Sequence, residues 1–170
     1  RQAPLRALKS GVDGGQLGSV FRARIEMVSG FDVFANQPFL RTLEQFVLTD
    51  VGTHVLDVAR FLFGEVESLA CHTQKIHADI AGEDVATVLL RARSGASVVV
   101  NLGYAGTPHE RERFPETFVF AEGDRGSVEL GPDYWLRTTT AEGTLSRRVP
   151  PPRYEWADPR YDVVHASGVP

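Results

Sequence analysis

The sequence predicts an α+β domain, in which an open-faced, mainly antiparallel sheet of about six strands carries helix on one face. Two observations support this prediction. Apolar residues recur with the period of a helix over residues 49–63, and beyond residue 64 they alternate with polar residues as in half-buried strands. Strands that follow one another through short turns pair in an antiparallel sheet, which packs helices on one side.

The first elements are a short helix and a strand. The segment before residue 16 has an amphipathic pattern and ends in glycines, so Gly14 or Gly15 is expected to be the left-handed cap. The strand that follows is predicted from an alternation in which one set of side chains is apolar and faces the core: Phe21, Ala23, Ile25 and Met27. Residues 29–47 are aromatic and irregular, which indicates an ordered functional loop.

The clearest helix carries two stripes of side chains. At about 100° per residue, Val51, Val55, Val58 and Leu62 form a buried stripe. Asp50, His54 and Asp57 form a second stripe on the same helix. Thr49 or Asp50 is expected to begin the helix, where a carboxylate also interacts favourably with the positive end of the helix dipole.

The remaining elements are strands joined by turns. They are expected over residues 65–76, 85–93, 96–104, 117–122, 127–130 and 135–139. Ser94-Gly95 predicts a tight hairpin, and residues 108–114 a solvated loop. In the runs 85–93 and 96–104 one face is apolar and the other is mixed, which suits a subunit interface. The domain is predicted to cover residues 1–149, with a proline-rich extended tail at 150–170.

Composition narrows the class of protein. The chain has 170 residues, a net charge of −4 and one cysteine. The charge argues against nucleic-acid binding, since such proteins concentrate basic residues on one face. One cysteine excludes an internal disulfide and a cysteine-based zinc site, and no apolar run reaches the roughly 18 residues of a membrane span. We therefore expect no nucleic-acid partner, no membrane association and a cytoplasmic protein.

The stripe of Asp50, His54 and Asp57 is the candidate site. A histidine one turn from a carboxylate is a common general base, because the carboxylate orients the imidazole and stabilises its protonated form. Gly52 would let a substrate approach this face closely. Two other interpretations stay open: Asp50 as a helix cap beside an exposed histidine, and a metal triad of all three residues, which the spacing allows.

Other residues carry weaker signals. Cys71 lies in an apolar strand and is expected to be a buried structural cysteine. His72 and His77 are expected on opposite faces of one strand, which excludes a shared metal. Glu83 and Asp84 open the next strand and are expected to point apart. We predict no metal site in this chain.

The candidate helix resembles the signature of the Gfo/Idh/MocA oxidoreductases, which are NAD(P)-dependent sugar and cyclitol dehydrogenases. The resemblance rests on Asp50-x-x-x-His54-x-x-Asp57, followed by Arg-Phe-Leu-Phe-Gly and a strand. Further segments fit the second domain of that family in the same order: the run Gly15–Val20 into an alternating strand, Gly82-Glu83-Asp84 before a strand, and the turn 122–127. The resemblance covers most of residues 5–140.

The resemblance implies a site and a cofactor. His54 would act as the acid/base on a sugar, cyclitol or polyol hydroxyl, and Asp50 would assist it and contact the substrate. Asp57 would make a structural hydrogen bond or bind substrate, and Arg41 could bind a polar or anionic substrate or be an exposed loop arginine. NAD or NADP would be held by an N-terminal Rossmann domain, whose G-x-G-x-x-G turn and Glu-Lys-Pro lysine have no counterpart here.

The resemblance also leads to expectations about the isolated chain. It should bind no cofactor and should be inactive alone, and it should form a homodimer or tetramer through the open sheet face. The alternative to this substrate and oligomerisation domain is a stand-alone sheet module that dimerises or binds a small ligand without chemistry.

Overall fold

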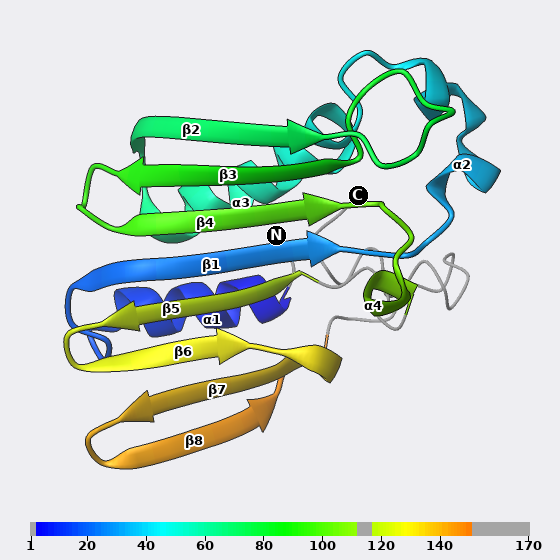
Figure 1. The fold of residues 1–170 in the computed structure, drawn as a ribbon. Coiled ribbons are helices and arrows are strands. Elements are labelled where there is room, and N and C mark those ends of the chain that lie inside the picture. The colour runs from blue at the N-terminus through cyan, green and yellow to red at the C-terminus, as the bar shows by residue number, and fades with distance from the viewer. Residues whose placement is uncertain (1–2, 112–116, 151–170) are drawn as a thin grey trace.

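The computed structural model describes residues 3–111 and 117–150. These residues form one eight-stranded sheet in the order β2-β3-β4-β1-β5-β6-β7-β8, in which β1 and β4 are parallel and all other neighbours antiparallel (Figure 1). The strands are β1 (Val20–Val28), β2 (Val66–Gln74), β3 (Val85–Ala92), β4 (Ser97–Gly103), β5 (Phe118–Gly123), β6 (Gly126–Leu130), β7 (Trp135–Thr140) and β8 (Gly143–Arg148). The predicted α+β class and open sheet are confirmed; the count is eight strands instead of about six.

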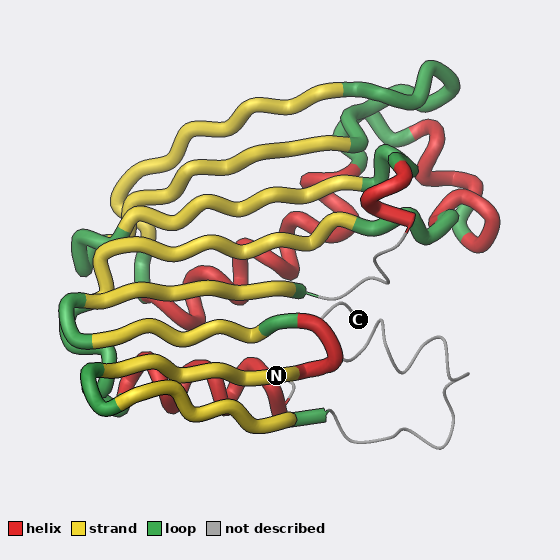
Figure 2. The backbone as a smooth tube through the Cα atoms, turned by 60° about the horizontal axis from the view of Figure 1, so that its bottom comes forward, coloured by secondary structure: helices red, strands yellow, loops and turns green. Residues whose placement is uncertain are grey.

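The two longer helices lie on the same face of the sheet. α1 (Ala3–Asp13) covers β6 and β7, and α3 (Thr53–Phe63) covers β1 and β4 (Figures 1 and 2). Short helical turns occupy the loops: α2 (Val33–Asn36), η1 (Pro38–Thr42), η2 (Leu48–Gly52), α4 (Pro108–Arg111) and η3 (Pro132–Tyr134). The opposite face of the sheet carries no helix of the described chain, as predicted.

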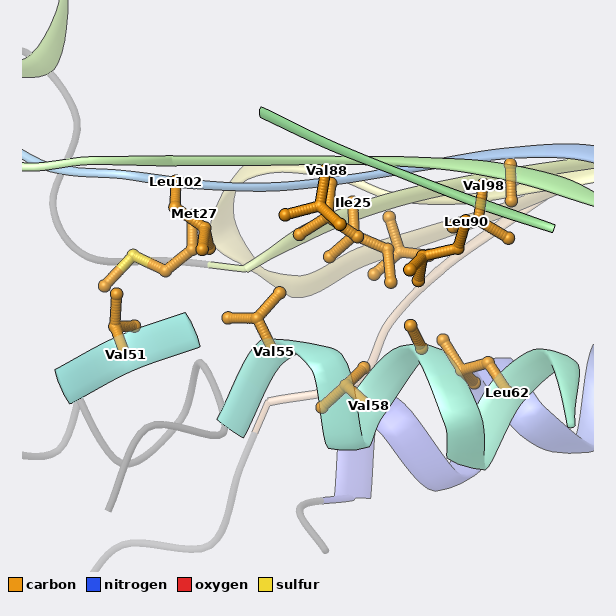
Figure 3. Close-up of a cluster of buried hydrophobic side chains, with 14 of the residues drawn as sticks. Ile25, Met27, Val51, Val55, Val58, Leu62, Val88, Leu90, Val98 and Leu102 are labelled. Atoms are coloured by element: carbon orange, nitrogen blue, oxygen red, sulfur yellow. The ribbon is translucent and has the colours of Figure 1, made fainter. Parts of the chain in front are cut away.

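The core lies between the sheet and the two helices α1 and α3. Val51, Val55, Val58 and Leu62 are all buried and point at the sheet, so the predicted apolar stripe is confirmed (Figure 3). They meet side chains from β1, β3 and β4, among them Ile25, Met27, Val88, Leu90, Val98 and Leu102. Replacing a buried leucine of this kind with alanine lowers the free energy of unfolding by about 2–5 kcal/mol. This packing fixes which way the polar side of α3 faces.

The predicted faces of β3 and β4 are also confirmed. Ala86, Val88 and Leu90 are buried on the helix side, whereas Thr87 and Leu89 are exposed on the open side. The hairpin between the strands turns at Gly95, whose φ of +94° is a conformation that favours glycine. Gly15, with φ of +73°, fills the expected role after α1.

Several local predictions are wrong, for identifiable reasons. Phe21 is 48% exposed because a bulge between Val20 and Arg22 shifts the register of β1. Cys71 is exposed because β2 is an edge strand that α3 leaves uncovered. In the segment expected as a loop, α4 brings Glu110 into the interior, where its carboxylate accepts the Gly106 N–H at 2.7 Å.

Of the predicted tail at 150–170, residues 151–170 lie outside the described residues. Within residues 3–111 and 117–150, no helix is both long and apolar enough to cross a bilayer.

Candidate functional site

The candidate site lies at one edge of the sheet, where β1, β2 and β4 end and α3 begins (Figure 1). Three loops meet there: residues 29–47, 75–84 and 104–107. We call this region the site edge. The main-chain N–H of Ala81 bonds to the carbonyl of Arg41 at 2.8 Å, and that of Tyr104 bonds to the carbonyl of Asp84 at 2.8 Å. These bonds join the loops into one structure around the start of the helix.

The helix that carries Asp50 and His54 begins earlier than predicted. Its first turn, Leu48–Gly52, is a π-turn that runs directly into α3. Asp50 is therefore inside the helical segment, with its N–H bonded to the carbonyl of Phe46 at 2.8 Å, and neither Thr49 nor Asp50 is the cap. No local pattern predicts the extra turn, because no capping residue precedes it. π-turns of this kind often occur at functional sites.

Asp50 and His54 are both partly buried and interact electrostatically. Burial raises the pKa of the Asp50 carboxyl, and the positive charge of His54 acts in the opposite direction. The Tyr104 hydroxyl belongs to the same neighbourhood: its burial and the charge of Asp50 raise its pKa well above the usual range. Tyr104 was not singled out from the sequence, although it continues the buried face of β4.

A cluster of aromatic rings packs against Tyr104. Phe46 is parallel to Tyr104 with ring centroids 5.8 Å apart, and Phe34 packs against Phe46 at 5.2 Å. Both phenylalanines are buried. The irregular segment 29–47 is therefore an ordered wall of the site edge, as its aromatic content predicts.

Arg41 is held by protein groups. Its guanidinium forms an ion pair with Asp79 and lies 4.4 Å from the centroid of the Phe34 ring. It therefore links loop 29–47 to loop 75–84, while the side chain stays 40% exposed.

His77 and Asp84 form a pair that sequence reasoning missed. β2 ends at Gln74, so His77 lies in a loop and not on the strand that was expected to separate it from His72. The Asp84 carboxylate is completely buried and accepts the main-chain N–H groups of Ile76 and His77 at 2.7 and 2.8 Å. The imidazole Nδ1 of His77 is 2.6 Å from Asp84 Oδ2. The hairpin itself is the missed signal, since Gln74 pairs with Val85 and brings the ends of the loop together.

Asp57 lies one turn further along α3 and is exposed. The nearby Arg60 donates a hydrogen bond to Glu65 at 2.7 Å. This bond and the charge of Glu65 raise the pKa of the Arg60 guanidinium, and the charge of Asp57 adds a smaller contribution. Gly52 is buried, and an added Cβ would lie 3.1 Å from Leu102 Cδ1 and from the Val47 carbonyl. Protein atoms therefore occupy the space beside Gly52 in which a substrate was expected to approach the helix.

The part of the chain that the structure describes shows neither a metal cluster nor a phosphate cradle. Among residues 3–111 and 117–150, no three His, Cys, Asp or Glu side chains are grouped to hold a metal ion. The glycines after α1 have another use: a Cβ on Gly18 would collide with the Asp124 carboxylate, which accepts the Ser19 N–H at 2.9 Å. A groove of about 1240 Å³ lies elsewhere, between α1 and the β7–β8 hairpin, and contains neither Asp50 nor His54.

The profile of the GFO/IDH/MocA C-terminal domain matches residues 5–129. The chain belongs to the GFO/IDH/MocA family. It is 40% identical to a D-apiose dehydrogenase of Paraburkholderia graminis and 39% identical to one of Rhizobium rhizogenes, over 99% and 98% of the chain. These alignments cover 44% and 48% of the relatives, so the chain spans about half their length.

Solved structures of the GFO/IDH/MocA family share the fold. An oxidoreductase from Agrobacterium radiobacter, solved with NAD⁺, L-tartaric acid and magnesium, is 36% identical and superposes with a TM-score of 0.91 over 99% of this chain and 49% of its own. An inositol dehydrogenase homologue from Azotobacter vinelandii, solved with NADH and myo-inositol, is 20% identical with a TM-score of 0.69 over 92% of this chain and 41% of its own. The second likeness supports the fold alone.

Proposed function

We propose that this chain is the substrate-binding and oligomerisation domain of an NAD(P)-dependent dehydrogenase that acts on a hydroxyl of a sugar, cyclitol or related polyol. The observation that carries the proposal is the placement of Asp50 and His54 one helical turn apart at the start of α3, both partly buried, on the site edge. The family match and the two D-apiose dehydrogenase relatives support the reaction class.

The chemistry assigned to this chain is proton transfer. A nicotinamide cofactor, when bound, would supply the acceptor for the hydride that leaves the substrate carbon. His54 takes the hydroxyl proton, so an O–H bond breaks, an N–H bond forms and the carbon becomes a carbonyl carbon. The Asp50 carboxylate stabilises the resulting imidazolium, and a positioned acid/base of this type contributes about 10²–10⁴-fold in rate. In the reverse direction His54 returns the proton to the alcohol.

The cofactor belongs to another part of the protein in this proposal. The described residues offer no glycine-rich turn from a strand into a helix, and the glycine at position 18 accommodates Asp124. We therefore assign no phosphate contact to these residues, and the choice between NAD and NADP is made outside them. The NAD⁺ complex of the Agrobacterium relative supports a nicotinamide cofactor for the full-length protein.

For the substrate, we favour a neutral sugar resembling D-apiose. The charge of Arg41 is already partly neutralised by Asp79, which weakens its attraction for a carboxylate substrate. A dihydroxy acid such as the tartrate found with the Agrobacterium relative is the second candidate. Asp57, which is exposed and faces Arg60, is proposed to support the helix more than to bind substrate, and Arg41 to fix the loop.

The open face of the sheet is proposed as the subunit interface of a homodimer or tetramer. It carries exposed apolar side chains, including Leu89 and Trp135, beside charged ones such as Arg22 and Arg24. Such a mixed face is typical of subunit contacts in soluble proteins.

The test is a comparison of wild type with His54→Ala in the full-length protein. D-apiose, myo-inositol and L-tartrate are assayed with NAD⁺ and NADP⁺, and circular dichroism monitors the fold. We expect D-apiose to be preferred and His54→Ala to lower kcat by about 10²–10⁴-fold with an unchanged spectrum. His72→Ala, an exposed histidine on the edge strand, is the matched control. Near-normal kcat in His54→Ala would overturn the assignment, and a full-length wild type without turnover would favour the non-catalytic module.

A further inference from the structure

The start of the helix that carries the Asp50–His54 pair is capped from a distant part of the chain. The first N–H groups of any helix have no partner within the helix. Here the main-chain N–H of Val47 donates to the Glu83 carbonyl at 3.0 Å, and that of Leu48 donates to the Glu83 carboxylate Oε1 at 3.1 Å. No local side chain caps this turn.

The cap acts on the π-turn at the start of the helix, where Val51 and Gly52 also pack against the sheet. Val55, Val58 and Leu62 hold α3 against the sheet, but they lie along its length (Figure 3). The π-turn, which contains Asp50, precedes them. A π-turn is wider and less regular than an α-helix, so its position depends on the groups that satisfy its free ends. Glu83 supplies two of these groups, and its negative charge also complements the helix dipole.

Glu83 is itself held rigidly. The next residue, Asp84, is completely buried and binds two N–H groups of loop 75–84, and its carbonyl accepts the N–H of Tyr104. On the other side, a Cβ at Gly82 would lie 2.6 Å from the carbonyl oxygen of Leu43, so this junction is closely packed against loop 29–47. The junction 82–84 therefore fixes the site-edge loops and the helix start together.

We propose that Glu83 is a positioning residue for the Asp50–His54 pair. Its carboxylate and carbonyl hold the π-turn in place. Asp50 then lies where it can orient His54 toward the substrate hydroxyl. This inference rests on the proposed function, because positioning has a kinetic consequence only if the pair is catalytic. Geometric errors of about 1 Å at such a pair can cost about 10²-fold in rate.

The test uses the full-length protein and three substitutions. Glu83→Ala removes the side-chain acceptor, Glu83→Gln keeps a neutral oxygen at the same reach, and Glu83→Asp keeps the charge on a side chain one methylene shorter. Glu65→Ala is the matched control, because Glu65 contacts the same helix at its other end through Arg60. kcat and KM are measured for the preferred substrate, with circular dichroism and thermal unfolding as readouts of the fold.

We expect Glu83→Ala to lower kcat by about 10- to 100-fold with a smaller change in KM, and Glu83→Gln to restore kcat to within about threefold of wild type. Glu65→Ala should change kcat less than twofold. If Glu83→Ala does not fold, Glu83→Asp is used instead. We expect it to have a lowered kcat and a circular dichroism spectrum like that of wild type.

Two results would overturn the proposal: a folded Glu83→Ala (or Glu83→Asp, where that replaces it) with wild-type kcat, or a Glu83→Gln protein as impaired as Glu83→Ala. His54→Ala is assayed in parallel. If it retains activity, the proposed function itself is wrong. If it is inactive while Glu83→Ala is normal, only the positioning role is lost.

Discussion

The Nδ1 atom of His77 lies 2.6 Å from Oδ2 of Asp84, a carboxylate with no exposed surface. The same carboxylate accepts two main-chain N–H groups of the loop before it. A carboxyl group is tolerated in such a buried place because each of its hydrogen-bond donors compensates for the lost hydration. The pair therefore fixes the shape of loop 75–84, on which both Glu83 and the ion pair of Arg41 depend.

Asp84→Ala should destabilise the protein by about 2 kcal/mol or more, since it leaves two N–H groups without their acceptor and the His77 ring without its partner. Asp84→Asn, which keeps one oxygen, should cost less. Urea denaturation measures both differences. Equal midpoints for the two variants and wild type would show that the loop is held by other contacts.

Asp50→Asn should raise the melting temperature at pH 7. Burial raises the pKa of Asp50 in the folded protein above its unfolded value of 3.8, so ionising this group costs stability. The cost is fully present above the folded pKa and disappears as the pH falls below the unfolded pKa. The advantage of the variant should therefore vanish near pH 3. Thermal unfolding of both proteins across this range measures it, and a variant less stable at pH 7 would contradict the sign.

The same Asp50→Asn protein should be less active. The neutral amide no longer stabilises the imidazolium of His54, so kcat should fall by about 10²-fold or more. Assays at pH 7 measure this loss. A stable but slow variant is the expected combination, because the charge serves catalysis at the expense of folding, whereas unchanged kcat would remove Asp50 from the site.

Gly52→Ala should destabilise the protein by about 1–3 kcal/mol. The added methyl would lie 3.1 Å from Leu102 and from the Val47 carbonyl, and buried overpacking of this kind costs roughly that amount. Because Gly52 follows the π-turn residue Asp50 so closely, kcat should fall as well. Gly64→Ala is a poor control because its φ is +88°; Ser94→Ala, in an exposed hairpin, is a better one. An unaffected Gly52→Ala protein would mean that the helix start moves freely.

Leu89→Asp should dissociate the predicted oligomer into monomers. Leu89 is 50% exposed on the open face, opposite Val99 of β4, and a charge there would be buried in a sheet-to-sheet contact. Light scattering at micromolar concentration measures the mass. Leu69→Asp is the matched control, because Leu69 pairs with the buried Leu90 and so points to the helix side. A wild type that is already monomeric would exclude the interface.

Much of the fold could be predicted from local pattern. The stripe of α3, the faces of β3 and β4, and the turn at Gly95 follow from side-chain period and from glycine conformation, which depend on near neighbours in the chain. The pairing of Asp50 with His54 on one side of the helix follows from the same period. The family resemblance, carried by the same residues, is confirmed by the profile match.

The tertiary structure alone decided the surroundings of that helix. Residues 83 and 84 read as the start of a strand, yet one caps the helix 35 residues earlier and the other binds His77. Phe21 and Cys71 have apolar neighbours in sequence but are exposed, because a bulge and an edge position are properties of strand pairing. The sequence thus determined which residues face the core, since period is local. Which residues satisfy the free ends of helices and loops was decided by contacts between segments far apart in the chain, for which a single sequence carries no period.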